Sequence, residues 1–380
     1  MKTTKTPIKS SAVSSVERFD QKNIMFRRAG WDPECASSGK KFFGQHYPKK
    51  QPGYTLEDYA LLNSSWYVER RFGHGNELGN TDLFSWECLD GRVNKLAPGQ
   101  KLDSIDPKVM SERIKKVANL FGASLVGVAE LDERWVYSHS YDSITKASKP
   151  LELPEECKYV VVIGIEMDYD LVKTSPLAMA NATSGLAYSK MPFVAGLVGQ
   201  FIRLLGYKAL PIGNDTALSI PIAIDAGLGE LGRNGLLITP SFGPRVRICK
   251  VITDLPLVPD PPCEFGVEDF CQKCKKCAEH CPSQAILAEE RTASPLNISN
   301  NSGALKWPVD AERCFKYWAA NGASCCVCIR VCPFNKKPGR IHDLSRFFIE
   351  KAPSLNNFFI WLDDALGYGK QARAERFWQR

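Results

Sequence analysis

The stretch CQKCKKCAEHCP, residues 271–282, holds four cysteines in the spacing Cys-x2-Cys-x2-Cys-x3-Cys-Pro. Bacterial proteins use this spacing to bind cubane iron–sulfur clusters. The short loops let the first three thiolates converge on one cluster, while the Cys-Pro turn directs the fourth, Cys281, elsewhere. Where two clusters are bound, that fourth thiolate ligates the other cluster. A second cysteine motif is therefore expected.

The stretch ERCFKYWAANGASCCVCIRVCP, residues 312–333, supplies that second motif. Its final cysteines repeat the end of the first motif: Cys325, Cys328 and Cys332. Cys326 cannot be the missing first ligand, because it is one residue out of step. Cys314 is the better candidate, since the loop between it and Cys325 can fold back.

Crossed ligation divides the cysteines of the two motifs between two [4Fe–4S] clusters. One cluster takes Cys271, Cys274, Cys277 and Cys332. The other takes Cys281, Cys314, Cys325 and Cys328. Zinc or disulfides are the alternatives, but zinc usually takes two Cys-x2-Cys pairs and leaves the Cys-x3-Cys-Pro endings unexplained. The cysteines at 35, 88, 157, 249, 263 and 326 are expected to be small buried hydrophobic residues, with Cys326 as an alternative ligand.

The composition is that of a globular protein of two to three domains. The chain has 380 residues, of which 44% are hydrophobic, and a net charge of +7 with acids and bases interspersed. Such a charge indicates a solvated surface, so no nucleic acid is expected as a partner. No apolar run reaches the ~18 residues of a membrane span. The stretch 1–15 has neither a twin-arginine motif nor the apolar segment of a leader.

Changes of pattern along the chain indicate four regions. Residues 1–105 are aromatic-rich and interrupted by Pro and Gly, which predicts an N-terminal region of short helices wrapping the core. Alternating helix and strand patterns predict an α/β core, of the α+β kind, over 106–262. The cysteine motifs predict a ferredoxin-like two-cluster domain over 263–340. Residues 341–380 are expected to form a tail packed on the body.

The apolar periodicity predicts the individual elements of the core. Helices are expected over 106–122, 176–205 and 216–227. Strands are expected over 124–131, 158–167 and 208–213, with two more within 236–255 around a Ser-Phe-Gly-Pro turn. The tail is expected to contain a helix over 358–369.

The segment Gly227-x-Gly229-x-x-Gly232 matches the dinucleotide-binding fingerprint. That fingerprint requires a strand before the glycines and a helix after them, so that a helix N-terminus meets the pyrophosphate. Here the expected helix precedes and the strand follows. The glycines are instead expected to form a turn, or to let the backbone approach another large ligand closely.

Together with the cysteine motifs, two further segments resemble the respiratory reductive dehalogenases: RAGWDPE (28–34) and NDTALSIPIAIDAGLGELGRNGLLITPSFGPRVRICKV (214–251). The resemblance covers nearly the whole chain. It implies a nitroreductase-like core that binds a corrinoid base-off, with the clusters reducing its cobalt to Co(I). None of the five histidines lies in the Asp-x-His-x-x-Gly motif that supplies a lower ligand in methyl-transferring B12 proteins. This agrees with base-off binding.

The resemblance also implies a proton donor and its neighbours. Tyr188 corresponds to the family's tyrosine donor, and Asn214 and Arg247 correspond to its pocket asparagine and arginine. A guanidinium close to a phenol favours the anion, which assists proton donation. Arg245, two residues earlier on the same face of a strand, is the rival of Arg247. Contacts with the corrinoid or the pocket are expected from Gly229, Gly232, Arg245 and Trp318.

The expected activity is the two-electron, one-proton replacement of halogen by hydrogen on a small organohalide, with a chlorinated alkane or alkene favoured. Aromatic residues of the N-terminal third are expected to supply part of a dry pocket. The family implies a mature protein on the outer face of the cell membrane after leader removal. Its expected partners there are a small integral-membrane anchor subunit and an upstream electron donor; a homodimer is left open.

Two other classes of protein carry a similar cluster motif. Epoxyqueuosine reductase, which acts on tRNA, has the same cofactors, and the missing leader favours it. The segment RAGWDPE, the aromatic N-terminal region and the Tyr–Asn–Arg set argue against it, as does the lack of a basic groove. A plain electron-transfer ferredoxin is the non-enzymatic alternative, and it would contain no corrinoid.

Overall fold

A four-stranded antiparallel sheet lies at the centre of the computed structural model, which describes residues 16–73, 82–87, 96–97, 99–103 and 105–379. The strands follow the order β1 (Leu125–Glu130), β4 (Tyr159–Glu166), β8 (Val246–Thr253) and β5 (Ala209–Ile212). Each pair is antiparallel, with Ile165 opposite Arg247 and Ile212 opposite Lys250. The predicted α/β core of the α+β kind is confirmed.

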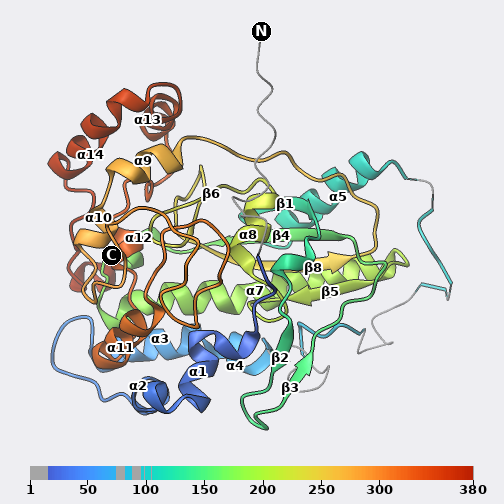
Figure 1. Ribbon diagram of the computed structural model, residues 1–380, viewed down its shortest axis with the longest axis horizontal. Coiled ribbons are helices and arrows are strands. Elements are labelled where there is room, and N and C mark those ends of the chain that lie inside the picture. The colour runs from blue at the N-terminus through green and yellow to red at the C-terminus, as the bar shows by residue number, and fades with distance from the viewer. Residues whose placement is uncertain (1–15, 74–81, 88–95, 98, 104, 380) are drawn as a thin grey trace.

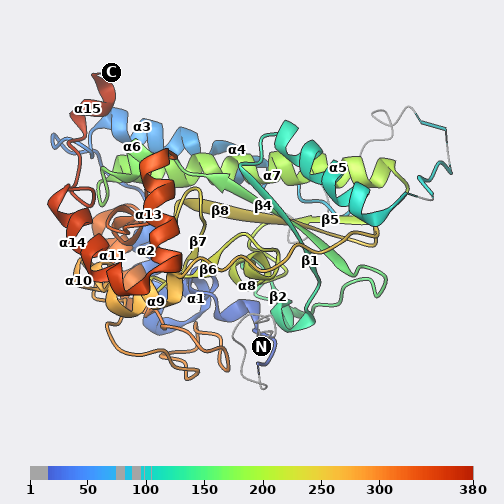
Figure 2. The same cartoon turned by 90° about the horizontal axis from the view of Figure 1, so that it is seen from above.

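Helices cover both faces of this sheet (Figure 2). The long helix α7 (Asn181–Leu204) and α5 (Pro107–Leu120) pack on one face, and α8 (Ser219–Asp225) packs on the other. Alternate side chains of β4 therefore enter two different cores, as period-two geometry requires. Val161 and Ile163 join the α7 side, whereas Val160 and Val162 join the α8 side.

The elements predicted for the core form close to the expected positions. Helix α5 begins where Asp106 caps the backbone N–H groups of Lys108 and Val109, with Pro107 in the first turn. The structure adds one detail to the expected pair of strands near the end of the core. The strands around the Ser-Phe-Gly-Pro turn have different partners, because β7 (Leu237–Ile238) pairs with β6 (Glu230–Leu231) while β8 joins the central sheet.

Short helices make up much of the described N-terminal part of the chain, as expected. They are α1 (Met25–Trp31), α2 (Pro33–Phe43), α3 (Leu56–Ser65) and α4 (Tyr67–Phe72). Helices α3 and α4 pack on α7, and α2 packs on a helix of the cysteine-rich segment (Figure 1). Further short elements of the core are α6 (Tyr169–Val172), β2 (His139–Tyr141) and β3 (Ser148–Pro150).

The cysteine-rich segment and the tail lie together at one end of the molecule (Figures 1 and 2). Their helices are α9 (Val267–Lys273), α10 (Lys276–Glu279), α11 (Ala311–Asn321), α12 (Val327–Arg330), α13 (Arg340–Lys351), α14 (Asn356–Ala365) and α15 (Glu375–Trp378). The tail helix α14 is anchored by its buried Asp363, which pairs with Lys276 and Lys336. Over the described residues, no helix is both long and apolar enough to cross a bilayer.

Candidate active site

The cysteines of the two motifs lie in two groups. In the first, burial raises the pKa of Cys332 well above its usual value, and the nearby thiols of Cys271, Cys274 and Cys277 raise it further. In the second, burial raises the pKa of Cys314 to about 12, with added contributions from Cys325 and Cys281. Burial also raises the pKa of Cys328, as do Cys325 and Cys314 and, with smaller effects, Cys326 and Cys277. The division of the ligands by crossed ligation stays a prediction, because Cys326 and Cys277 also act on members of the second group.

Such clustering of buried thiols fits iron–sulfur clusters. Burial makes seven of these thiols costly to ionise, whereas at Cys281 burial is outweighed by hydrogen bonds, which lower the pKa. Binding to iron supplies the positive charge that stabilises the thiolates. No three His, Cys, Asp or Glu side chains within the described residues are placed to hold a single metal ion.

Cys326, next to Cys325 in the sequence, is close enough to Cys314, Cys325 and Cys328 to add to the rise that burial causes in their pKa values, but its sulfur also contacts α7. Its sulfur is 3.8 Å from the hydroxyl of Ser184 on α7, and the residue is buried in the core beneath the central sheet. Three of the other cysteines expected to be small hydrophobic residues are also buried: Cys35, Cys157 and Cys249. Cys263 is half-buried. Cys88 lies outside the described residues.

Tyr188 and Asn214 meet at one edge of the core. The Asn214 side chain donates from Nδ2 to the Tyr188 hydroxyl at 2.7 Å. Its Oδ1 accepts a hydrogen bond from the Ser219 hydroxyl at 3.0 Å. Tyr188 is half-buried and Asn214 is exposed, so the pair faces open space rather than the sealed core.

Arg247 and Trp66 complete the surroundings of Tyr188. The guanidinium carbon of Arg247 lies 5.6 Å from the centre of the Tyr188 ring, and its Nη2 donates to Ser184 at 3.1 Å. The Trp66 ring stacks on Tyr188 with 5.0 Å between ring centres. Trp66 is one of the aromatic residues of the N-terminal third that were expected to supply part of a pocket, and its role as a pocket wall stays a prediction.

Arg245, the rival of Arg247, faces a different part of the protein. It is fully buried, and its Nε donates to the Asn335 side chain at 3.0 Å. It also contacts Glu166 and the carbonyl of Met167. These contacts connect the core to the cysteine-rich segment. Of the two arginines, Arg247 is the one beside Tyr188, and a corrinoid contact from Arg245 stays a prediction.

The two glycines expected to face the cofactor pack against the protein itself. A Cβ on Gly229, which has φ +158°, would lie 2.0 Å from the carbonyl oxygen of Ile238. A Cβ on Gly232 would lie 2.8 Å from the side chains of Asn234 and Ile238. Gly229 just before β6 and Gly232 just after it therefore allow the backbone here to pack closely on β7. Any contact with a corrinoid stays a prediction.

Two buried donors near the proposed pocket residues lack an acceptor within the described part of the protein. They are Nε of Arg247 and the indole N–H of Trp318. Buried donors normally have partners, so these two fit a bound group that accepts hydrogen bonds, as a corrinoid does. Trp318 otherwise belongs to an aromatic cluster with Phe26 and Phe42, at 6.1 and 6.0 Å between ring centres.

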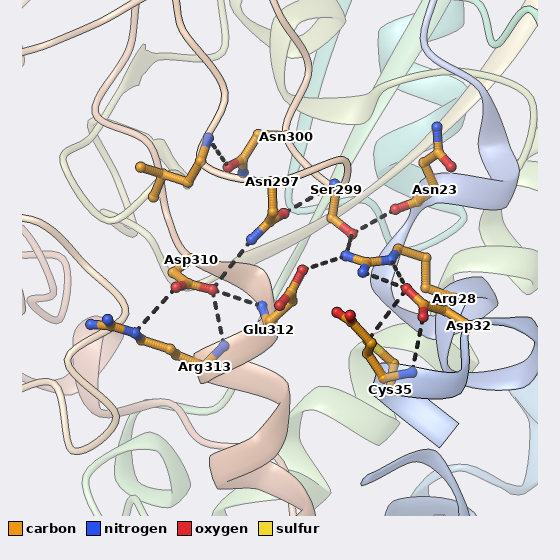
Figure 3. A network of polar contacts seen from close by, with 12 residues as sticks. Asn23, Arg28, Asp32, Cys35, Asn297, Ser299, Asn300, Asp310, Glu312 and Arg313 are labelled. Carbon is orange, nitrogen blue, oxygen red and sulfur yellow. Dashed lines mark hydrogen bonds and ion pairs between the residues drawn. The ribbon is translucent and has the colours of Figure 1, made fainter. Parts of the chain in front are cut away.

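The segment RAGWDPE connects the N-terminal helices to α11, which carries Cys314 (Figure 3). The Arg28 side chain is only 4% exposed and pairs with Asp32 of the same segment. Its Nη1 also donates to Glu312 at 2.8 Å and to Ser299 at 3.1 Å. Asp32 in turn caps α2 through the N–H of Glu34. The motif therefore positions the helix that supplies a predicted cluster ligand, a role that the sequence alone did not indicate.

Comparison with known proteins agrees with this geometry. Residues 270–335 match the family model described as a 4Fe-4S double cluster binding domain. The chain is 36% identical to the tetrachloroethene reductive dehalogenase of Sulfurospirillum multivorans, over 88% of this chain and 73% of that protein. The chain belongs to the reductive dehalogenase family. It also matches a solved structure titled as suggesting a mechanism for B12-dependent dehalogenation, with a TM-score of 0.74 and 26% identity.

Membership confirms the enzyme class and the cofactors. The reductive dehalogenase is an oxidoreductase of carbon–halogen bonds that uses a corrinoid and two [4Fe–4S] clusters. The match to this solved structure covers 96% of the present chain but only 48% of the solved chain. The epoxyqueuosine reductase of Cyclobacterium marinum is 34% identical over 59% of this chain. The match to epoxyqueuosine reductase therefore leaves about two fifths of this chain unaligned.

Proposed function

We propose that this reductive dehalogenase replaces halogen by hydrogen on a small organohalide, with Tyr188 as the proton donor. The change takes up two electrons and one proton, breaks the carbon–halogen bond and releases halide. When bound, the corrinoid cobalt supplies the electron pair that breaks this bond, and the clusters supply its electrons. The observation that carries the proposal is the 2.7 Å hydrogen bond from Asn214 to Tyr188.

This hydrogen bond leaves Tyr188 ready to act as an acid. Because the phenol oxygen accepts from Asn214, its own proton is free to point toward a substrate. When that proton is transferred, Asn214 still donates to the phenolate, and the positive charge of Arg247 beside the ring favours the anion. The stacked Trp66 covers the ring and limits the access of water.

The proposed substrate is a chlorinated alkane or alkene. A small halocarbon offers apolar area and few hydrogen-bonding groups, so a site with aromatic walls suits it. Trp66 beside Tyr188 supports this choice. The name of the Sulfurospirillum relative, a tetrachloroethene enzyme, points in the same direction.

We propose that the two cysteine groups are the cluster ligands. The first cluster is then held by Cys271, Cys274, Cys277 and Cys332. The second is held by Cys281, Cys314, Cys325 and Cys328. The effects of Cys271, Cys274 and Cys277 on the pKa of Cys332, and of Cys325 and Cys281 on that of Cys314, support this division.

We further propose that the enzyme lies on the outer face of the cell membrane, bound to a small integral-membrane anchor subunit and supplied by an upstream electron donor. The resemblance to the respiratory members of the family supports this location. Fractionation of native cells tests it. Recovery in the membrane fraction, with release when the anchor gene is deleted, is expected, whereas a cytoplasmic protein would contradict it.

The activity is tested with anaerobically purified enzyme loaded with corrinoid. We expect cobalt, about eight iron atoms per chain, and halide release from chlorinated alkenes. Tyr188→Phe should keep both cofactors while turnover falls by about 10²–10⁴. Tyr207→Phe is the matched control, because that hydroxyl donates to the Leu102 carbonyl away from the site.

Two outcomes would contradict the proposal. Full turnover in Tyr188→Phe would mean that another group delivers the proton. A loaded enzyme that releases no halide but reduces epoxyqueuosine in a tRNA stem-loop would instead support the tRNA-modifying function.

A further inference from the structure

Lys250, in the middle of β8, is a fully buried ammonium group. Its Nζ donates to the carbonyl oxygens of Gly213 at 2.6 Å and Ala217 at 3.1 Å, and to the Ser219 hydroxyl at 2.7 Å. These three bonds use all three of its N–H groups. None of the three acceptors is charged. Burying a cation among neutral partners is costly, and burial lowers the pKa of Lys250 to about 8.

A directed chain of hydrogen bonds connects this cation to the site. Ser219 accepts from Lys250 and donates to Asn214 Oδ1 at 3.0 Å, and Asn214 donates from Nδ2 to Tyr188 at 2.7 Å. An ammonium can only donate, so the Ser219 proton is turned toward Asn214. Because the Ser219 proton needs an acceptor, the Asn214 amide must present its oxygen to Ser219. The amide NH2 group must then face Tyr188.

We propose that Lys250 is a positioning residue for Tyr188 that acts through Ser219 and Asn214. The inference rests on the proposed role of Tyr188 as proton donor. Without the chain, the Asn214 amide can turn over and present its oxygen to the phenol. The phenol would then donate its proton to Asn214 instead of the substrate. With the chain in place, the phenol oxygen is held as an acceptor and the phenolate is stabilised by a donor that a cation polarises.

A purely structural role for Lys250 makes a different prediction. Two of its bonds go to carbonyl oxygens of the loop between β5 and α8, and these alone stabilise the loop. Ser219→Ala keeps both of those bonds and removes the hydroxyl that accepts from Lys250 and donates to Asn214. A structural role predicts no effect of this change on Tyr188, whereas a positioning role predicts a clear one.

The test compares Ser219→Ala, Ser219→Thr and Lys250→Met in the cofactor-loaded enzyme. For Ser219→Ala we expect kcat to fall about tenfold, the weight of one hydrogen bond, with KM changed less than twofold. Ser219→Thr keeps the hydroxyl and should restore kcat. Lys250→Met should resemble Ser219→Ala, and if it fails to fold, the two Ser219 variants still decide the question.

A second readout does not depend on turnover. In the full chain labelled with ¹³Cζ-tyrosine, Ser219→Ala should shift the Tyr188 signal, because the Asn214 amide can then turn over and the phenol changes from acceptor to donor. The signal is assigned with Tyr188→Phe. The other charged or titratable groups are unchanged in these variants: Arg247 and Tyr137 face Tyr188, and Asp215 and Cys249 face Lys250.

The outcomes separate this inference from the proposed function. If Tyr188→Phe loses turnover while Ser219→Ala changes neither kcat nor the Tyr188 ¹³Cζ signal, the positioning role is overturned and the proton donor stands. If Tyr188→Phe turns over normally, the proposed donor fails. The Tyr188 ¹³Cζ signal in Ser219→Ala then still reports whether the chain orients Asn214.

Discussion

Arg28 Nη1 donates to the carboxylate of Glu312 at 2.8 Å, although the two residues are 284 positions apart in the sequence. The same guanidinium pairs with Asp32, so one side chain joins α1 and the start of α2 to α11 (Figure 3). Two residues beyond Glu312, α11 carries Cys314, a proposed ligand of the second cluster. The position of that ligand therefore depends on a contact with the N-terminal helices.

Replacing Arg28 tests this dependence. Arg28→Ala leaves two carboxylates without their partner, and we expect a loss of about 3 kcal/mol in the free energy of unfolding together with reduced iron retention. Arg28→Lys should have a stability and an iron content between those of the parent and Arg28→Ala, because an ammonium cannot reproduce the planar fork of the guanidinium. Unfolding by urea and iron content per chain measure both effects.

Arg313→Ala is the control on the same helix. Arg313 pairs with Asp310 at 3.3 Å, but its side chain is 59% exposed, so its removal should change stability by less than about 1 kcal/mol. If Arg28→Ala behaved like this control, the contact with Glu312 would have no part in holding α11.

Two adjacent cysteines should respond in opposite ways to substitution. Cys325 lies in the second thiol group, whereas Cys326 points to Ser184 in the core. Cys325→Ser should therefore reduce iron from about eight to about four atoms per chain, while Cys326→Ser retains both clusters. Iron analysis and the electron paramagnetic resonance signal of the reduced protein measure this. Loss of a cluster in Cys326→Ser alone would reverse the assignment.

Both the charge and the planar shape of the Arg247 guanidinium should affect turnover. Arg247→Ala removes the cation beside the Tyr188 ring, and we expect kcat to fall by about 10². In Arg247→Lys, kcat should fall less, because the charge remains while the bond to Ser184 is lost. Steady-state kinetics of halide release provide the measurement. Equal activity in the Ala and Lys variants would show that the charge is not used.

Glu69 should make stability fall as the pH rises. Burial, followed by the nearby charge of Asp215, raises the pKa of Glu69 from 4.5 to about 8. The folded protein then keeps this proton up to about pH 8, whereas the unfolded chain loses it near pH 4.5. The free energy of unfolding decreases across that window.

Glu69→Gln removes this penalty. At pH 8 the variant should be more stable than the parent by about 1–3 kcal/mol, and the difference should be smaller at pH 6. Urea unfolding at both pH values measures it, with the exposed Glu57→Gln as the control. A gain for Glu69→Gln that is equal at both pH values would contradict the raised pKa.

The sequence by itself determined the features that depend on local spacing. The cysteine spacing predicted two clusters, because ligands a few residues apart can converge only through short loops of defined length. The β-branched run of β4 and the capped start of α5 predicted their elements, since hydrogen bonds and apolar alternation act over a few residues. The resemblance carried by the two longer segments then led to the family, the enzyme class and the cofactors.

Only the tertiary structure decided which side chains meet. Arg245 and Arg247 are equivalent by strand alternation, and they differ because Asn335 of a distant segment lies against one and Tyr188 against the other. Lys250 reads in the sequence as an ordinary strand residue. Its link to Tyr188 exists because the loop before α8 folds over β8 and places Ser219 and Asn214 between them. Contacts of this kind depend on the packing of whole elements, and residue spacing along one element carries no information about them.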